Sequence, residues 1–181
     1  MTASLTRPVA PDPYSLLPAV PAFELRSDDV HQGERVPDVH TNTAAGRNVS
    51  PHLAWSGFPP ETRSFLVTCF DPDAPGPAGW WHWTLVDVPA STTELPQGVG
   101  TPDGTDLPPG AFQLRGDDGV AAYRGAAPPP GDQVHRYFFV VHTLDVPSLG
   151  LDAETLPGKA STAAVFHTLA RAVLVGTYQT T

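Results

Sequence analysis

Hydrophobic residues along the chain occur mostly in runs of strand length rather than at helical spacing. Residues 64–70 (SFLVTCF) are apolar on both faces of an extended chain, which is typical of an interior strand packed on two sides. Residues 82–88 (HWTLVDV) and 134–144 (VHRYFFVVHTL) are rich in aromatic and β-branched side chains and predict two more strands. Shorter strands are expected at three further places: 23–25, 53–55 and 172–178. The pattern therefore indicates a mainly β protein.

The two-residue period of a strand also predicts which side chains share a face. In the first long run, one face should hold Phe65, Val67, Cys69 and Asp71. In the second, His82 and Val88 should lie on the face opposite Trp83. In the third, His135 and Tyr137 fall on one face and Arg136 on the other.

Helical spacing is convincing in one segment, from Ser161 to Arg171, where apolar residues recur every three or four positions. Ser161 can cap the N-terminus of such a helix, and Arg171 suits the negative end of the helix dipole. We therefore expect a peripheral helix over these residues.

Proline and glycine, 22 and 16 residues respectively, divide the 181-residue chain. Residues 1–20 are rich in proline and have no sustained period, so they predict an extended N-terminal arm, followed by a single domain over 21–181. The loop after the strand 64–70 reads DPDAPGPAGWWHW from residue 71 and contains three prolines and two glycines. Such a loop is stiff, and stiff loops on a sheet often position binding groups.

The charge and cysteine content exclude several classes of function. The net charge of −9 argues against a nucleic-acid partner, and the ten Lys and Arg residues are too scattered for a polybasic membrane patch. Cys69, a single cysteine in an apolar run, is expected to be a buried small hydrophobe. No signal peptide and no apolar run of about 18 residues is evident. We expect a soluble, cytoplasmic protein, with leaderless export left open.

Familiar catalytic and metal motifs do not fit the sequence. Asp71, Asp73 and Gly76 match three positions of a calcium-binding loop, but Pro75 and His82 occupy positions that should supply ligands. The seven histidines are dispersed, so no metal site and no cofactor is predicted. The sequence contains no nucleophile motif and no phosphate-binding loop, so we expect that the protein is not an enzyme. A hydrolase using Asp71 and His82 as an acid–base pair is the least favoured alternative.

Polar residues near the ends of the three long strands are the candidate site: Asp71, Asp73, His82, His135 and Tyr137. If the three strands are neighbours, imidazole and phenol donors would converge beside a carboxylate that can fix a histidine tautomer. Such a set suits a phosphate or carboxylate head group. Taken singly, Asp71 and Asp73 have an ordinary structural interpretation as turn formers, and His82 and His135 as core residues.

Together the motifs D-P-D-A-P at 71–75, G-W-W-H-W at 79–83 and H-R-Y at 135–137 resemble the phosphatidylethanolamine-binding protein family, also called the Raf kinase inhibitor protein family. S-P-H-L-A-W at 50–55 and the proline-rich turn at 128–131 are similar to that family too. The likeness runs from about residue 22 to 178 and is nearest to the bacterial members.

The resemblance implies a large central antiparallel sheet packed on a smaller sheet, with one or two peripheral helices. It also implies binding of small anions or phospholipid head groups, such as phosphate, phosphoethanolamine or carboxylates, without catalysis. Bacterial members are expected to be homodimers, to which residues 1–20 could contribute. Carried over by motif, the pocket would be lined by Asp71, Asp73, Trp80, His82, Ala127, Pro128, His135 and Tyr137.

Two further expectations concern the loops. The family likeness implies cis peptide bonds at Ala74–Pro75 and Gly79–Trp80. The alternative function is a protein that inhibits a protease or regulates a kinase through the loops of 98–132. The regulatory partners of animal members are not carried over, because those proteins end in a pocket-side helix that this sequence lacks.

Overall fold

The computed structural model describes residues 5–180; the first four residues of the predicted arm, and Thr181, lie outside the described part. The strands are β1 Glu24–Arg26, β2 Leu53–Ser56, β3 Ser64–Asp71, β4 Trp80–Pro89, β5 Glu94–Leu95, β6 Phe112–Gln113, β7 His135–Leu144 and β8 Thr168–Tyr178. The helical elements are the 3₁₀ turns η1 Pro13–Leu16 and η2 Asp38–His40 and the α-helix α1 Pro157–Val165. None of the helices in residues 5–180 is long and apolar enough to span a membrane.

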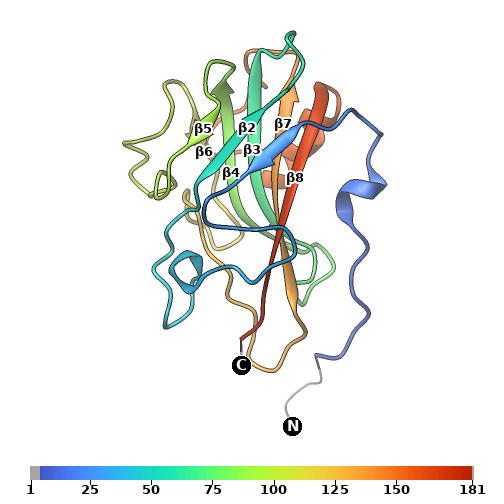
Figure 1. Ribbon diagram of the computed structural model, residues 1–181, viewed down its shortest axis with the longest axis vertical. Coiled ribbons are helices and arrows are strands. Elements are labelled where there is room, and N and C mark those ends of the chain that lie inside the picture. Colours follow the sequence, from blue (N-terminus) through green and yellow to red (C-terminus); the bar gives the residue numbers. More distant parts are fainter. Residues whose placement is uncertain (1–4, 181) are drawn as a thin grey trace.

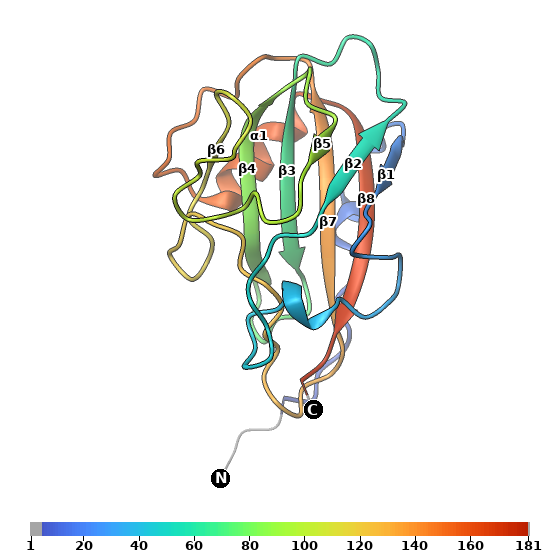
Figure 2. The same ribbon diagram turned by 60° about the vertical axis from the view of Figure 1, so that its left-hand side comes forward.

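The strands form two antiparallel sheets, as the mainly β prediction required. The larger sheet has the order β6-β4-β3-β7-β8, and the smaller has the order β1-β2-β5 (Figure 1). In Figure 2 the small sheet lies in front of the large one, with α1 behind it. The expectation of a large central antiparallel sheet packed on a smaller one, with a peripheral helix, is confirmed.

The main core lies between the two sheets. It holds Leu53 and Trp55 of β2 together with alternate side chains of the large sheet, among them Phe65, Val67, Cys69, Phe139 and Val141. This confirms the predicted inward face of β3 and the buried position of Cys69. Burial raises the pKa of the Cys69 thiol well above its usual value, which keeps it protonated.

The outer face of the large sheet is covered partly by α1. Ala160 and Ala164 of the helix pack in a second cluster with Leu66, Val86 and Leu144 of the sheet. Small alanine side chains let the helix lie close to the strands.

The helix is not where the sequence pattern placed it. It begins after Leu156 with Pro157 at its first position and ends at Val165, so Ser161 lies inside it. Residues 168–171, predicted as its end, belong to β8, where Arg171 pairs with His142 of β7. The prediction of a helix over 161–171 was therefore right for 161–165 and wrong for 168–171. Pairing with β7 along almost its whole length outweighed the local helical spacing.

β4 contains two bulges, and the one near its C-terminal end changes which of its side chains face the core. Phe65 pairs with Val88 but Val67 with Leu85, so β4 carries an extra residue there, and Asp87 adopts a positive φ of 57°. Val88 consequently joins Leu85 in the main core instead of facing away from it. β-bulges shift the alternation in this way.

The N-terminal arm lies along the outer face of the large sheet, beside β8 in Figure 1. It contains the short turn η1, so it is not extended throughout. The Tyr14 ring lies 5.9 Å from the Phe138 ring and 6.0 Å from the His142 ring, measured between centroids. The arm and α1 thus cover different parts of the same sheet face.

Candidate functional site

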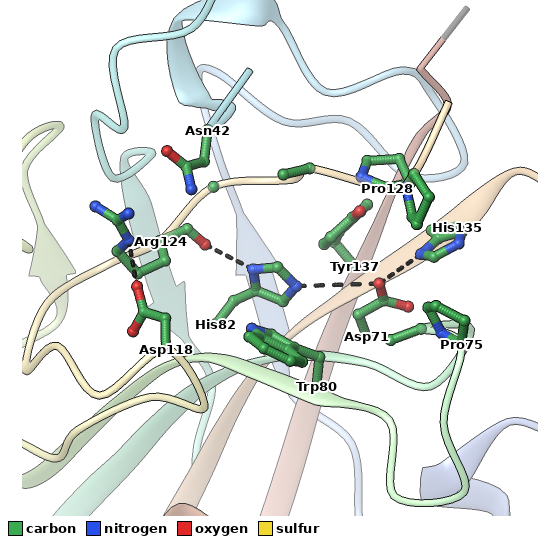
Figure 3. Close-up of a pocket in the computed structure, with 14 residues that line it drawn as sticks. Asn42, Asp71, Pro75, Trp80, His82, Asp118, Arg124, Pro128, His135 and Tyr137 are labelled. Carbon is green, nitrogen blue, oxygen red and sulfur yellow. Dashed lines mark hydrogen bonds and ion pairs between the residues drawn. The ribbon is translucent and has the colours of Figure 1, made fainter. Parts of the chain in front are cut away.

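A cavity of about 270 Å³ opens at one end of the large sheet (Figure 3). The ends of β3, β4 and β7 meet there with the loops after β3 and before β7. Seven of the eight residues predicted for the site line this cavity: Asp71, Trp80, His82, Ala127, Pro128, His135 and Tyr137. The structure therefore places the ends of the three long strands side by side, as the sequence analysis supposed.

His82 reaches the cavity through the second bulge of β4. Cys69 pairs with Trp83 and Phe70 with Trp81, so His82 is an extra residue between the two pairs. The bulge turns its imidazole toward the cavity, on the same side as Trp83 rather than the opposite side predicted from simple alternation. A bulge beside a site commonly re-aims one side chain in this way.

The contacts of His82 fix its tautomer. Its Nδ1 lies 2.7 Å from the carbonyl oxygen of Arg124, which can only accept, so Nδ1 carries the hydrogen. Nε2 is buried, has no hydrogen-bond partner among the described residues and lies 4.0 Å from Oδ2 of Asp71. Burial lowers the pKa of His82 more than the nearby Asp71 raises it. The neutral ring thus presents an unpaired acceptor to the cavity.

Asp71 ends β3 and connects the two walls of the cavity. Its Oδ2 accepts a hydrogen bond from Nδ1 of His135 at 2.7 Å, and its Oδ1 accepts one from the backbone N–H of Asp73 at 2.7 Å. Both carboxylate oxygens are therefore occupied within the protein. The residue orients its neighbours more than it offers a free group to a ligand.

His135 lies between two carboxylates. Its Nε2 lies 3.0 Å from Oδ2 of Asp132, and its Nδ1 is bonded to Asp71. Burial lowers the pKa of His135, but the two carboxylates outweigh burial and raise it overall. A hydrogen bond from Arg7, the largest cause, together with His135 holds the pKa of Asp132 well below its usual range. Of the two cavity histidines, His135 therefore takes up a proton more readily than His82.

Tyr137 contributes a buried hydroxyl. Its ring meets the His82 ring edge-on, with centroids 5.1 Å apart. Its Oη makes no hydrogen bond of normal geometry to the described residues, although the backbone of Ala127 lies close to it. Burial, and then the negative charge of Asp71, raise the pKa of Tyr137, so it keeps its proton and can donate.

Asp73 is not part of the cavity wall, which corrects the prediction. Arg136 donates to it through Nε at 2.7 Å and through a terminal nitrogen at 2.8 Å, and the Arg136 backbone N–H adds a third bond at 3.1 Å. Burial raises the pKa of Asp73, but these bonds outweigh burial and lower it overall. With a buried and fully paired carboxylate, Asp73 anchors the loop to β7. β3 ends at Asp71 and Asp73 lies in the turn that follows, so the two-residue period of a strand does not fix the direction of its side chain.

A scan against known families matches the model described as phosphatidylethanolamine-binding protein to residues 26–179. The chain belongs to this family. The UPF0098 proteins YbhB and YbcL of Escherichia coli are 42% identical over 159 residues and 45% identical over 137 residues. The YbhB match covers 86% of this chain and 99% of that protein; the YbcL match covers 74% and 75%. The family resemblance and the bacterial relatives expected from the sequence are confirmed.

Solved structures of the phosphatidylethanolamine-binding protein family share the fold. The crystal structure of E. coli YbcL matches with a TM-score of 0.85 and 40% identity, covering 88% of this chain and 99% of that one. A Chlamydia trachomatis homologue matches with a TM-score of 0.75 and 27% identity, covering 88% and 99%.

Family-based expectations about the peptide bonds are not met here. The bonds Ala74–Pro75 and Gly79–Trp80 are trans, as is every other peptide bond of residues 5–180. Gly79 instead takes a positive φ of 63°, which turns the chain into β4.

Sequence reasoning missed three polar residues of the cavity: Asn42, Asp118 and Arg124. All three lie in irregular segments, and Arg124 is paired with Asp118 at 2.5 Å between Nε and Oδ2. No periodicity marks such positions. Arg124 followed by Gly125, near the recognised turn at 128–131, was the only local hint. Among residues 5–180, no group of three or more His, Cys, Asp or Glu is arranged to hold a metal ion.

Proposed function

We propose that the cavity binds small anions or phospholipid head groups, such as phosphate, phosphoethanolamine or carboxylates, and that the protein acts without catalysis. One observation carries the proposal: Nε2 of His82 and Oη of Tyr137 are buried polar atoms that make no hydrogen bond of normal geometry to residues 5–180, and both residues line the same cavity. Buried polar groups without partners cost free energy, which a bound ligand would recover.

Oη of Tyr137 and Nε2 of His82 require different hydrogen-bonding groups on a ligand. The Tyr137 O–H can donate to an anionic oxygen. The neutral His82 can accept from a protonated oxygen, such as the P–OH of a phosphate monoanion. A phosphate monoester has a second pKa of about 6, so it can instead transfer its proton to Nε2 of His82. The protonated ring then donates a hydrogen bond to the phosphate oxygen. A partly protonated phosphate or carboxylic group satisfies both atoms.

The charges around the cavity favour moderate affinity. Asp71 is offset by His135, and Asp118 is paired with Arg124, so no unpaired cation dominates the wall. The half-exposed indole of Trp80 at the rim offers an apolar and cation-accepting face to the remainder of a head group.

The lining also supports binding rather than hydrolysis. Among the residues that the structure describes, it contains no Ser, Thr, Cys or Lys side chain that could attack a substrate. The Asp71 oxygens are occupied by His135 and the Asp73 backbone, and Asp71 is 4.0 Å from His82, too far for a hydrogen-bonded acid–base pair.

His82→Ala tests the proposal. Loss of the imidazole should weaken phosphate and phosphoethanolamine binding by about tenfold or more in calorimetric or NMR titrations. His167→Ala is the matched control, because His167 is an exposed histidine paired with Asp145. Equal affinity of His82→Ala and the parent would refute the assignment. Inhibition of a protease or kinase that survives His82→Ala would favour the alternative mechanism through the surface loops.

We also propose that the protein is a homodimer, as the family resemblance implies for bacterial members, and that it is located in the cytoplasm. Light scattering of the purified chain tests the first, and cell fractionation tests the second. A monomer at micromolar concentration would contradict the dimer.

A further inference from the structure

Arg7 joins the N-terminal arm to the wall of the cavity. Its two terminal nitrogens donate to Oδ1 and Oδ2 of Asp132 at 2.7 and 2.9 Å, a two-pronged pair. It also donates to the backbone oxygen of Asp73 and lies 3.4 Å from Nε2 of His135. The Asp132 side chain is 1% exposed, so the pair is shielded from solvent on the carboxylate side.

The arm is held at two further places, which keeps Arg7 in position. The backbone N–H of Ala10 donates to Oδ1 of Asp73 at 3.2 Å, and the backbone oxygen of Ala10 accepts from Arg136 at 2.7 Å. Tyr14 then packs on the outer face of the sheet and lies 3.4 Å from the Thr68 hydroxyl. Arg7 is thus fixed by an ordered segment and not by a freely moving terminus.

The chain of contacts alternates in charge as it approaches the cavity. It runs from Arg7 to Asp132, His135 and Asp71, and Nε2 of His82 faces the last of these. With His135 protonated, the two carboxylates and one imidazolium carry one net negative charge, and Arg7 cancels it. The paired carboxylate raises the pKa of Arg7 above its already high value, so the guanidinium stays charged. A wall without Arg7 would repel an anion.

The arm lies outside the part of the chain that defines the family, because the family model begins at residue 26. Membership of the phosphatidylethanolamine-binding protein family therefore does not account for Arg7.

We propose that Arg7 sets the charge of the cavity wall and thereby the affinity of the cavity for anions. The N-terminal arm, by holding Arg7 in place, then maintains anion binding. The inference rests on the proposed anion-binding function. Release of the arm, by a partner or by cleavage, would leave Asp132 unpaired on one side and weaken anion binding.

The test compares Arg7→Ala and Arg7→Lys with the parent in titrations with inorganic phosphate. We expect about tenfold weaker binding for Arg7→Ala, because one nearby charge is lost, and recovery of most of the affinity in Arg7→Lys. Arg26→Ala is the control, since Arg26 forms an exposed pair with Asp28. Thermal unfolding of each variant shows that it is folded.

A second readout is the titration of His135 by NMR without ligand. Its surroundings are Asp71 of β3, Asp132 of the preceding loop, Arg7 of the arm and, across Asp71, His82 of β4. Removing the Arg7 charge should raise the pKa of His135. Asp132→Asn removes a negative charge beside the same ring and should shift the pKa of His135 in the opposite direction.

Unchanged phosphate affinity in Arg7→Ala overturns the proposal. Weaker affinity with an unmoved His135 pKa also overturns it, because the arm would then act through shape and not charge. Failure of the parent to bind phosphate would refute the proposed function instead. In that case the His135 titration still decides whether Arg7 sets the wall charge.

Discussion

His135 at the start of β7 donates a 2.7 Å hydrogen bond to Asp71 at the end of β3, linking residues 64 positions apart in the chain. Both side chains are almost fully buried. The bond ties the two central strands together at the mouth of the cavity. It also turns one carboxylate oxygen of Asp71 away from any ligand, so the pair is a structural support for the site.

Asp71→Asn should therefore destabilise the protein. The amide cannot replace the carboxylate both as charge partner of His135 and as acceptor from the Asp73 N–H, so the free energy of unfolding should fall by about 1–3 kcal/mol. Urea denaturation monitored by tryptophan fluorescence measures this. Asp28→Asn is the control, because Asp28 forms an exposed pair with Arg26. Equal stability of Asp71→Asn and the parent would show that the bond contributes nothing net.

Acid should destabilise the fold through His142. This residue is buried beneath the arm, and burial, reinforced by Arg171, lowers its pKa to about 3. The unfolded chain binds the proton near the ordinary pKa of about 6.5, so stability is complete above that pH and is lost as the pH falls. The loss should approach about 1.4 kcal/mol per pH unit between about 6.5 and 3.

His142→Gln isolates this contribution. The stability difference between parent and variant, measured by urea denaturation across the pH range, should shrink or reverse below pH of about 6. His167→Gln, at a more exposed position, is the control for replacing a histidine by glutamine. A parent-minus-variant difference that is independent of pH would contradict the burial argument.

Much of the architecture could be predicted because buried strand positions produce a regular pattern of apolar residues in the sequence. The strand 64–70 was found because both of its faces are apolar, and β7 because its aromatic and β-branched run is long. The loop after β3 was recognised from its prolines and glycines. These signals are local, so a single sequence reveals them.

The remainder depended on contacts between distant segments. The bulge that turns His82 into the cavity arises from its pairing with β3, and simple alternation put His82 on the wrong face. The helix was misplaced because pairing with β7 extends β8 back to Thr168. Arg7 lies 125 positions from Asp132, and nothing in the arm's composition indicates that contact.

Gly79→Ala should disrupt the loop that carries Trp80. A Cβ at this position would lie 2.5 Å from the Phe70 ring and 2.7 Å from the Asp71 backbone oxygen, and the positive φ of 63° disfavours alanine as well. We expect a loss of about 1–3 kcal/mol in unfolding free energy and weaker phosphate binding. Thermal unfolding and NMR titration measure the two effects.

Gly76→Ala in the same loop is the matched control. A Cβ there meets no atom within 4 Å, and its φ is not in the left-handed region. This change should leave stability equal to or slightly above that of the parent, because alanine reduces the freedom of the unfolded chain. Equal behaviour of the two variants would show that the loop adapts and that its backbone geometry does not shape the cavity.

Two buried tyrosines allow binding to be separated from stability. In the described part of the chain the Tyr137 hydroxyl has no hydrogen-bond partner of normal geometry, whereas the Tyr123 hydroxyl donates to the His40 carbonyl oxygen at 2.8 Å. Tyr137→Phe should reduce phosphate affinity by about tenfold and leave stability unchanged or slightly higher, since no satisfied bond is lost. Tyr123→Phe should cost about 0.5–1.5 kcal/mol of stability and leave affinity unchanged. Calorimetric titration and urea denaturation of both variants give the comparison. Reduced stability together with unchanged affinity in Tyr137→Phe would assign its hydroxyl a structural role and remove it from the proposed binding site.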